Sequence, residues 1–218
     1  MDLFYRAQPP PTAFLWTFRL PVGTLSIIGP RRGVLLEHAF RERLMRSLLM
    51  LSLLALVMSL RAEAAELQVG DEAPEFNLPG SDGETYQLAD FEGKQAVVLA
   101  WYPKAFTGGC TKECKSLREQ GEAVRQYEVA YFAASVDQPE LNKKFAQSLD
   151  LDFPILSDPS KQVAQAYGVV GPSRQVAQRW TYYIGKDGKI LAIDKQVNVA
   201  SHGADIANKL AELGVDKK

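Results

Sequence analysis

One cysteine of this sequence stands where the local backbone would make its sulfur reactive. Cys110 follows the apolar run Ala96–Tyr102, which has the composition of a buried strand, and precedes a segment with helical periodicity. That periodicity is carried by Cys114, Leu117, Gly121 and Val124. The first turn of a helix offers free N–H groups and the positive end of the helix dipole, which stabilise a thiolate. Since the thiolate is the reactive form of cysteine, we expect Cys110 to be a nucleophile.

The residues around this cysteine form a longer motif. Residues 102–113 read Tyr-Pro-Lys-Ala-Phe-Thr-Gly-Gly-Cys-Thr-Lys-Glu, which contains Pro-x-x-x-Thr-x-x-Cys. The pattern resembles the active-site motif of peroxiredoxins, the cysteine-dependent peroxidases of the AhpC/TSA superfamily. The longer string is similar to the peroxiredoxin Q (bacterioferritin-comigratory) class. Segments 70–76 and 179–188 also match in the expected order, so the resemblance runs from about Val69 to Leu213.

The resemblance implies that the chain reduces hydrogen peroxide and organic hydroperoxides in antioxidant defence. Cys110 would attack one peroxide oxygen and become a sulfenic acid while the other oxygen leaves. A thioredoxin-like or other thiol reductant would restore the thiol. No metal, haem or flavin is required by this chemistry.

Three further residues are expected to assist Cys110. The hydroxyl of Thr107 would lie near the sulfur and bind the peroxide, and helix N-capping is its alternative role. The ring of Pro103 would limit water at the sulfur, or it would only end the strand. The resemblance places the active-site arginine at Arg179, whose guanidinium would lower the thiol pKa and bind peroxide oxygens. Arg174 is the nearby competitor for that role.

The motif departs from the family pattern at Gly108, where proline is usual. Together with Gly109, this glycine lets backbone N–H groups approach an anion closely. It also makes the loop more flexible and leaves one more N–H group to satisfy. The departure removes no catalytic group.

Cys114 has three interpretations that the residues leave open. Peroxiredoxin Q relatives often carry a resolving cysteine five residues after the nucleophile, where this chain has Lys115. Residues four apart on a helix have Cβ atoms about 5–6 Å apart, whereas a disulfide needs roughly 3.5–4.5 Å. Cys114 could resolve Cys110 if the helix unwinds locally, fill the apolar stripe as a small core residue, or bind a metal.

Two other classes of protein use cysteines at a similar spacing. Sco-type copper proteins combine Cys-x-x-x-Cys with a distant histidine as soft ligands, here Cys110, Cys114 and His202. That assignment leaves Pro103, Thr107 and Arg179 unexplained. Thiol–disulfide oxidoreductases use Cys-x-x-Cys, which is one residue shorter than the spacing here. In the peroxiredoxin interpretation, His202 is expected to be a capping or surface residue without a catalytic role.

The elements that must position these residues alternate between strands and helices. Strands are expected at 76–78, 85–88, 96–102, 130–136, 153–156, 180–184 and 190–193. Helices are expected from the nucleophile to about 126, around 141–149, from 158 or 160 to 167, and from 201 to 213. This order predicts an α/β fold with a central mixed sheet flanked by helices, and it fits a thioredoxin-like fold.

The beginning of the chain has the pattern of a secretory signal. Ser47–Leu60 is an apolar run of 14 residues, preceded by Arg46 and followed by the small-x-small sequence Ala62-Glu63-Ala64. This run is shorter than the roughly 20 residues that a membrane-spanning helix needs. We therefore expect export, to the periplasm, with an uncleaved membrane anchor or an organellar transit segment as alternatives.

These observations divide the chain into three parts. We expect Met45 to be the natural start, so that 1–44 is upstream sequence, 45–64 the signal peptide and 65–218 a single catalytic domain. The domain carries 17 Lys and Arg and 22 Asp and Glu, a net charge of −5, without a basic patch. Nucleic acid is therefore not an expected partner. We expect a monomer or weak dimer that meets the membrane only through its export signal.

Overall fold

The computed structural model describes residues 41–47, 49–50 and 66–218 and divides the chain into two units, 1–61 and 62–218. In the first unit the described residues are helical and exposed, and Arg46 pairs with Glu42 at 3.7 Å. Within the described ranges, no helix is long and apolar enough to cross a membrane. The predicted cleavage site and most of the predicted signal and upstream segments lie outside the described residues, so those assignments stay predictions.

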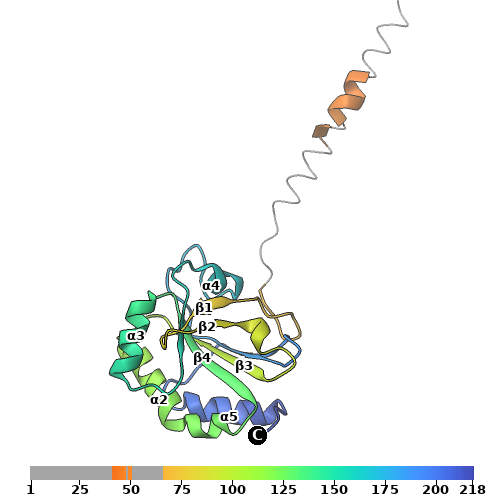
Figure 1. Cartoon of the computed structure of the whole chain (residues 1–218). Coiled ribbons are helices and arrows are strands. Elements are labelled where there is room, and N and C mark those ends of the chain that lie inside the picture. The colour runs from red at the N-terminus through yellow and green to blue at the C-terminus, as the bar shows by residue number, and fades with distance from the viewer. Residues whose placement is uncertain (1–40, 48, 51–65) are drawn as a thin grey trace, which may run out of the picture. The chain divides into compact units, whose positions relative to one another are not determined.

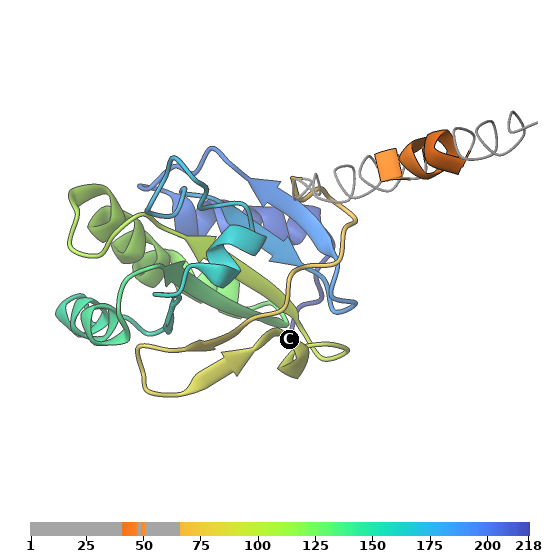
Figure 2. The same ribbon diagram turned by 90° about the horizontal axis from the view of Figure 1, so that it is seen from above.

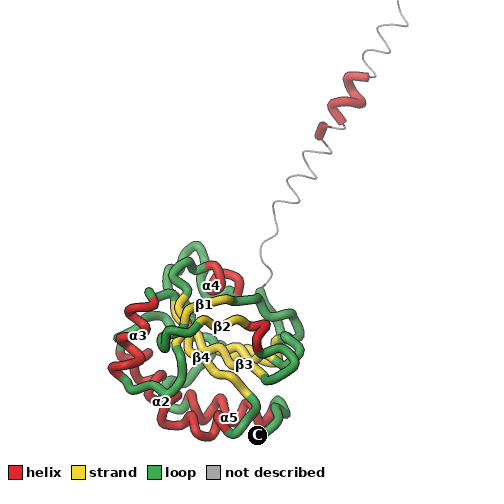
Figure 3. The backbone as a smooth tube through the Cα atoms, in the orientation of Figure 1, coloured by secondary structure: helices red, strands yellow, loops and turns green. Residues whose placement is uncertain are grey.

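A five-stranded mixed sheet forms the centre of the second unit (Figure 3). In spatial order its strands are β5 (Ile155–Ser157), β4 (Val129–Ser135), β3 (Ala96–Trp101), β6 (Thr181–Ile184) and β7 (Ile190–Asp194). β3 runs parallel to β4, and β4 to β5, whereas β6 is antiparallel to both β3 and β7. Every residue of β3 is buried, as expected for a central strand that is covered on both faces.

Helices and a small hairpin cover this sheet. The helices are α2 (Gly108–Arg125), α3 (Pro139–Ser148), α4 (Gln162–Ala166) and α5 (His202–Glu212), with a 3₁₀ turn η1 (Leu88–Asp90). The hairpin pairs β1 (Asn77–Pro79) with β2 (Thr85–Gln87). Figure 1 shows α2 and α5 side by side along one face, with α4 and the hairpin on the other. Figure 2 shows the hairpin, in yellow, on the outside of the domain.

The central strand supplies side chains to two hydrophobic cores. Val98 packs in the core that holds Leu117 of α2 and Leu210 of α5. Leu99 packs in the opposite core, which holds Tyr167. Because side chains alternate across a strand, one continuous apolar run serves both cores. The loop 102–107 then joins the end of β3 to the start of α2.

The predicted α/β class and the order of strands and helices are confirmed. The largest difference is α4, which is only five residues long instead of extending from 158 or 160 to 167. It begins after Lys161, whose φ is +63°, and the Asp158 carboxylate accepts a hydrogen bond from the Ala164 N–H at 2.8 Å. A residue in the left-handed region breaks the helical path, so the turn before α4 is not part of the helix.

Candidate active site

Cys110 is the third residue of α2, directly after the loop that leaves β3. Its side chain is buried, with only 1% of the residue exposed. The loop is held in place by Asp137, whose carboxylate accepts a hydrogen bond from the Ala105 N–H at 2.8 Å. The next residue, Phe106, has a φ of +60° and packs its exposed ring against Phe145 of α3 at 5.0 Å between centroids. The sulfur thus sits in the first helical turn, at the carboxyl end of the central strand.

Arg179 reaches this sulfur from a segment 69 positions later in the sequence. Its Nη2–H group donates to the Cys110 Sγ at 3.4 Å. The residue lies two positions before β6, and the Trp101 N–H donates to the carbonyl of the intervening Trp180 at 2.9 Å, next to the paired part of β3 and β6. The competitor Arg174 is exposed in the preceding loop. Strand pairing therefore brings Arg179 to the cysteine and leaves Arg174 at the surface.

A buried carboxylate holds the other side of the same guanidinium. Glu113, on the first turns of α2, is 1% exposed and forms an ion pair with the Nη1 of Arg179 through its Oε2. Its second oxygen, Oε1, lies 3.0 Å from the Nδ1 of His202. The Nε2 of His202 lies 2.9 Å from the hydroxyl oxygen of Thr181 on β6. Arg179, Glu113 and His202 therefore link the sulfur to the start of α5, and Thr181 extends the series to β6.

The expectation that His202 is a surface or capping residue is wrong. It is the first residue of α5 as expected, but it is only 1% exposed because this end of α5 packs on α2. Burial lowers its pKa to about 4, so the imidazole is neutral at pH 7. The sequence does not predict a role for Glu113, although this residue ends the motif that surrounds Cys110. Its spacing of three residues from the nucleophile, which places both on neighbouring positions of one helix face, is the only signal for it.

Cys114 lies one helical turn below Cys110 and is fully buried, with 0% exposure. Both cysteines are free thiols in this structure. Burial raises the pKa of the Cys114 thiol far above that of an ordinary cysteine, with the nearby Cys110 as a second cause. Cys114 is therefore protonated at neutral pH and cannot attack as a thiolate while α2 is intact.

Thr107 and Pro103 stand in the loop as the sequence suggested, but without contacts that define their roles. Thr107 occupies the N-cap position of α2 and makes no capping hydrogen bond. Its exposed hydroxyl donates instead to the Lys104 carbonyl at 2.9 Å. Pro103 is half-buried. Their parts in peroxide binding and in limiting water therefore stay predictions.

The described residues contain no group of three or more His, Cys, Asp and Glu side chains that could hold a metal ion. His202, the histidine of the Sco-type alternative, is directed at Glu113 and Thr181 instead of completing a site with both cysteines. The copper-binding alternative has no support from this geometry.

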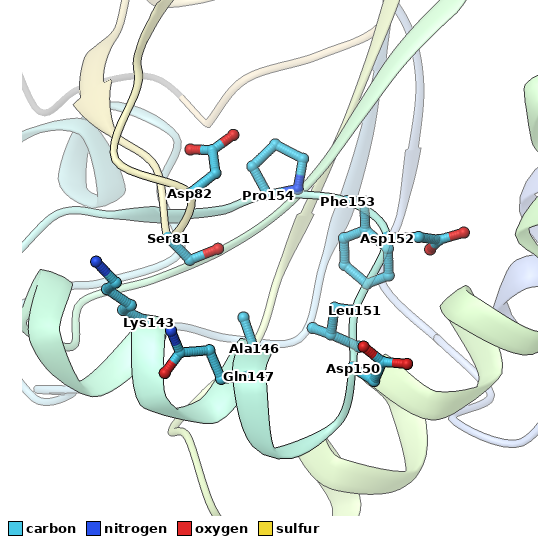
Figure 4. A pocket seen from close by; sticks show the side chains of 10 residues that line it. All are labelled: Ser81, Asp82, Lys143, Ala146, Gln147, Asp150, Leu151, Asp152, Phe153 and Pro154. Atoms are coloured by element: carbon cyan, nitrogen blue, oxygen red, sulfur yellow. The ribbon is translucent and has the colours of Figure 1, made fainter.

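A surface pocket of about 480 Å³ lies on another part of the domain. Figure 4 shows side chains from α3 and the neighbouring loops around it, namely Ser81, Asp82, Lys143, Ala146, Gln147, Asp150, Leu151, Asp152, Phe153 and Pro154. None of the residues that surround Cys110 contributes to its lining. We therefore place the candidate active site at Cys110 and not in this pocket.

Comparison with known proteins gives the class to which this fold and site belong. A model of the AhpC/TSA family matches residues 69–193, which is more than half of the chain. The chain belongs to the AhpC/TSA family. Peroxiredoxin Bcp of Escherichia coli (strain K12) is 36% identical over 152 residues, covering 67% of this chain and 97% of that relative. Peroxiredoxin Bcp of Bacillus subtilis (strain 168) is 31% identical over 153 residues, covering 67% and 97%.

Solved structures agree with this placement. The crystal structure of peroxidoxin BcpB from Mycobacterium tuberculosis is 29% identical, with a TM-score of 0.61 over 67% of this chain and 97% of that one. A mutant of Xylella fastidiosa PrxQ, at 24% identity and a TM-score of 0.60 over 69% and 99%, has the same fold. The predicted family resemblance and the thioredoxin-like fold are both confirmed.

Proposed function

We propose that this chain is a thiol peroxidase that reduces hydrogen peroxide and organic hydroperoxides through Cys110. The observation that carries the proposal is the hydrogen bond from the Arg179 guanidinium to the Cys110 sulfur inside the first turn of α2. A permanent cation and a helix N-terminus both favour the thiolate. Family membership and the names of the relatives support the same chemistry.

The reaction begins when the thiolate of Cys110 attacks the terminal oxygen of a hydroperoxide. An S–O bond forms as the O–O bond breaks, so the sulfur is oxidised to a sulfenic acid and the peroxide is reduced. The leaving oxygen carries the negative charge and takes a proton from solvent to give water or an alcohol. Arg179 lies where its N–H groups stabilise this growing charge, and the Thr107 hydroxyl orients the peroxide.

Two routes return the sulfenic acid to the thiol, and they differ in what α2 must do. An external thiol can attack the sulfur, release water and leave a mixed disulfide that a second thiol reduces. Attack by Cys114 instead requires the first turns of α2 to unwind, because its buried thiol is held four residues away on the intact helix. A thioredoxin-like protein or another thiol reductant is the partner in both routes.

Mutation of the nucleophile tests the function. Cys110→Ser should abolish peroxide consumption, since a serine hydroxyl is not ionised near neutral pH. Cys114→Ser is the matched variant, and it should keep the first oxidation step. A Cys110→Ser protein that retains most of its peroxidase activity would refute the assignment.

Mass spectrometry after one equivalent of hydrogen peroxide separates the two routes. Loss of two hydrogens, with Cys110 linked to Cys114, identifies an intramolecular cycle. A single added oxygen on Cys110 identifies a one-cysteine peroxidase that depends on an external thiol, with Cys114 as a packing residue.

We also propose that the enzyme acts after export, in the periplasm, as a monomer or weak dimer. The support is the apolar run Ser47–Leu60 between Arg46 and a small-x-small sequence. The intact mass of the native protein is the test. A mass that begins at Ala65 agrees with the proposal, whereas a mass that includes residues 1–44 contradicts the proposed start at Met45.

A further inference from the structure

The carboxylate of Glu113 is divided between two partners, one for each oxygen. Oε2 pairs with the Nη1 of Arg179, and Oε1 lies 3.0 Å from the Nδ1 of His202. An arginine and a carboxylate commonly pair through two parallel contacts that use both oxygens. Here the second oxygen faces the imidazole, so the guanidinium keeps its Nη2 for the Cys110 sulfur at 3.4 Å.

The protein therefore contains an arrangement that limits the ion pair to a single contact. We propose that His202 is a positioning residue for the peroxidase site. By occupying one oxygen of Glu113, His202 keeps one nitrogen of Arg179 on the Cys110 thiolate. This inference rests on the proposed function of Cys110. It assigns a role to a residue that touches neither the sulfur nor the substrate.

The imidazole is held in the orientation that this role needs. A carboxylate accepts hydrogen bonds only, so the tautomer with the proton on Nδ1 suits the 3.0 Å contact, although the two groups are not aligned for a hydrogen bond in this structure. The other nitrogen, Nε2, then accepts from the hydroxyl of Thr181, 2.9 Å away on β6. The ring of His202 is thus held between α2 and the sheet.

The backbone that carries His202 is also fixed against α2. The N–H of Gly203 lies 3.3 Å from the Ser116 hydroxyl, and the N–H of Ala204 donates to the Gln120 side chain at 2.8 Å. A Cβ atom at Gly203 would stand 2.8 Å from the Ser116 carbonyl oxygen, so only glycine permits this close approach. The first turn of α5 therefore holds the imidazole at a set distance from the carboxylate.

Charged groups from three elements and from the loop before β6 surround the imidazole. Burial and Arg179 lower the pKa of His202, whereas Asp194 at the end of β7 and Asp205 on α5 raise it. Glu113 on α2 is the group in direct contact. The imidazole is therefore neutral at the pH at which the thiolate reacts. A neutral ring orients the Glu113 carboxylate without cancelling its negative charge, so the carboxylate stays paired with Arg179.

Three substitutions separate positioning from packing. His202→Leu removes both ring nitrogens. His202→Gln retains an amide that reaches toward Thr181 but places no group at the Nδ1 position, whereas His202→Asn places an amide N–H near that position. Asn208→Ala, at an exposed position on the same helix, is the control that should match the parent protein.

The readout is the pKa of the Cys110 thiol, measured in the full chain carrying Cys114→Ser from the pH dependence of iodoacetamide alkylation. The second-order rate constant for hydrogen peroxide is measured on the same proteins. In His202→Leu and His202→Gln we expect the thiol pKa to rise by about one unit and the rate constant to fall roughly tenfold. His202→Asn should restore most of both values.

Two results would overturn this role. The first is that His202→Leu or His202→Gln has the same Cys110 thiol pKa and the same peroxide rate constant as the parent protein. The second is a His202→Asn protein as impaired as His202→Leu, because that would mean that only packing matters. Circular dichroism confirms that each variant is folded. Alkylation needs no peroxide, so a parent protein that fails to consume peroxide refutes the proposed function while the thiol pKa still decides the role of His202.

Discussion

The Nη2 of Arg179 lies 3.4 Å from the Sγ of Cys110, although 69 positions separate the two residues in the sequence. Two structural features create this contact. The cysteine lies in the first turn of α2, after the loop that leaves β3, and the arginine lies two residues before β6, the antiparallel neighbour of β3. The central pair of strands therefore determines which cation meets the nucleophile.

Replacement of Arg179 should show that the shape of the guanidinium matters as well as its charge. A lysine ammonium is a compact charge, so it cannot contact both the Glu113 carboxylate and the sulfur in the way that two guanidinium nitrogens do. We expect Arg179→Lys to lower the peroxide rate constant about 100-fold, close to the effect of Arg179→Met. Stopped-flow oxidation measures this effect, with Arg174→Met as the control at an exposed position. Wild-type rates in Arg179→Lys would contradict it.

Removal of the Glu113 carboxylate should destabilise the domain. The residue is 1% exposed, and its loss leaves the buried side of the Arg179 guanidinium without an ionic partner. Breaking a buried pair in this way costs about 3 kcal/mol. The free energy of unfolding of Glu113→Ala in urea measures the loss. Glu119→Ala, on the exposed face of the same helix, should change the stability by less than about 0.5 kcal/mol, and equal losses in both would argue against a buried ion pair.

Gly108→Pro should stabilise the protein without loss of peroxidase activity. Position 108 is the first residue of α2, where proline is favoured because its missing N–H would not be bonded within the helix. Thr107 has the extended backbone, φ −92° and ψ 152°, that a following proline requires. A Cβ atom at Gly108 would meet no described atom within 4 Å.

The expected gain is about 0.5–1 kcal/mol in the free energy of unfolding, because proline restricts the unfolded chain. Thermal or urea unfolding of the variant and the parent protein measures it. A destabilised Gly108→Pro protein would mean that the Gly108 N–H makes a contact that the fold needs.

Acid should weaken the fold through His202. Its pKa is lowered to about 4 by burial, against 6.5 for an exposed histidine, so between these values the unfolded chain binds a proton that the native protein does not. The stability contributed by the neutral ring is complete above pH 6.5 and decreases as the pH falls toward 4. The full effect is about 3 kcal/mol. NMR titration of the ring protons checks it, and a midpoint near 6.5 would show that the imidazole is not buried in solution.

Local sequence patterns determined the elements and the identity of the nucleophile. Residues 96–102 read as a buried strand, and the stripe that begins at Cys114 reads as a helix, because both periodicities depend only on neighbouring residues. The position of Cys110 in the first turn followed from these two patterns. The arginine was assigned from the family motif, and its approach to the sulfur depends on the pairing of β3 with β6.

The tertiary structure alone decided which polar residues are buried. A histidine at the start of a helix is as suitable for a solvated cap as for a buried contact, and the packing of α5 on α2 placed His202 against Glu113. Likewise, the apolar stripe of the helix favours the core for Cys114 but leaves open how completely the thiol is enclosed. Its full burial depends on residues from distant segments that meet only in the folded domain.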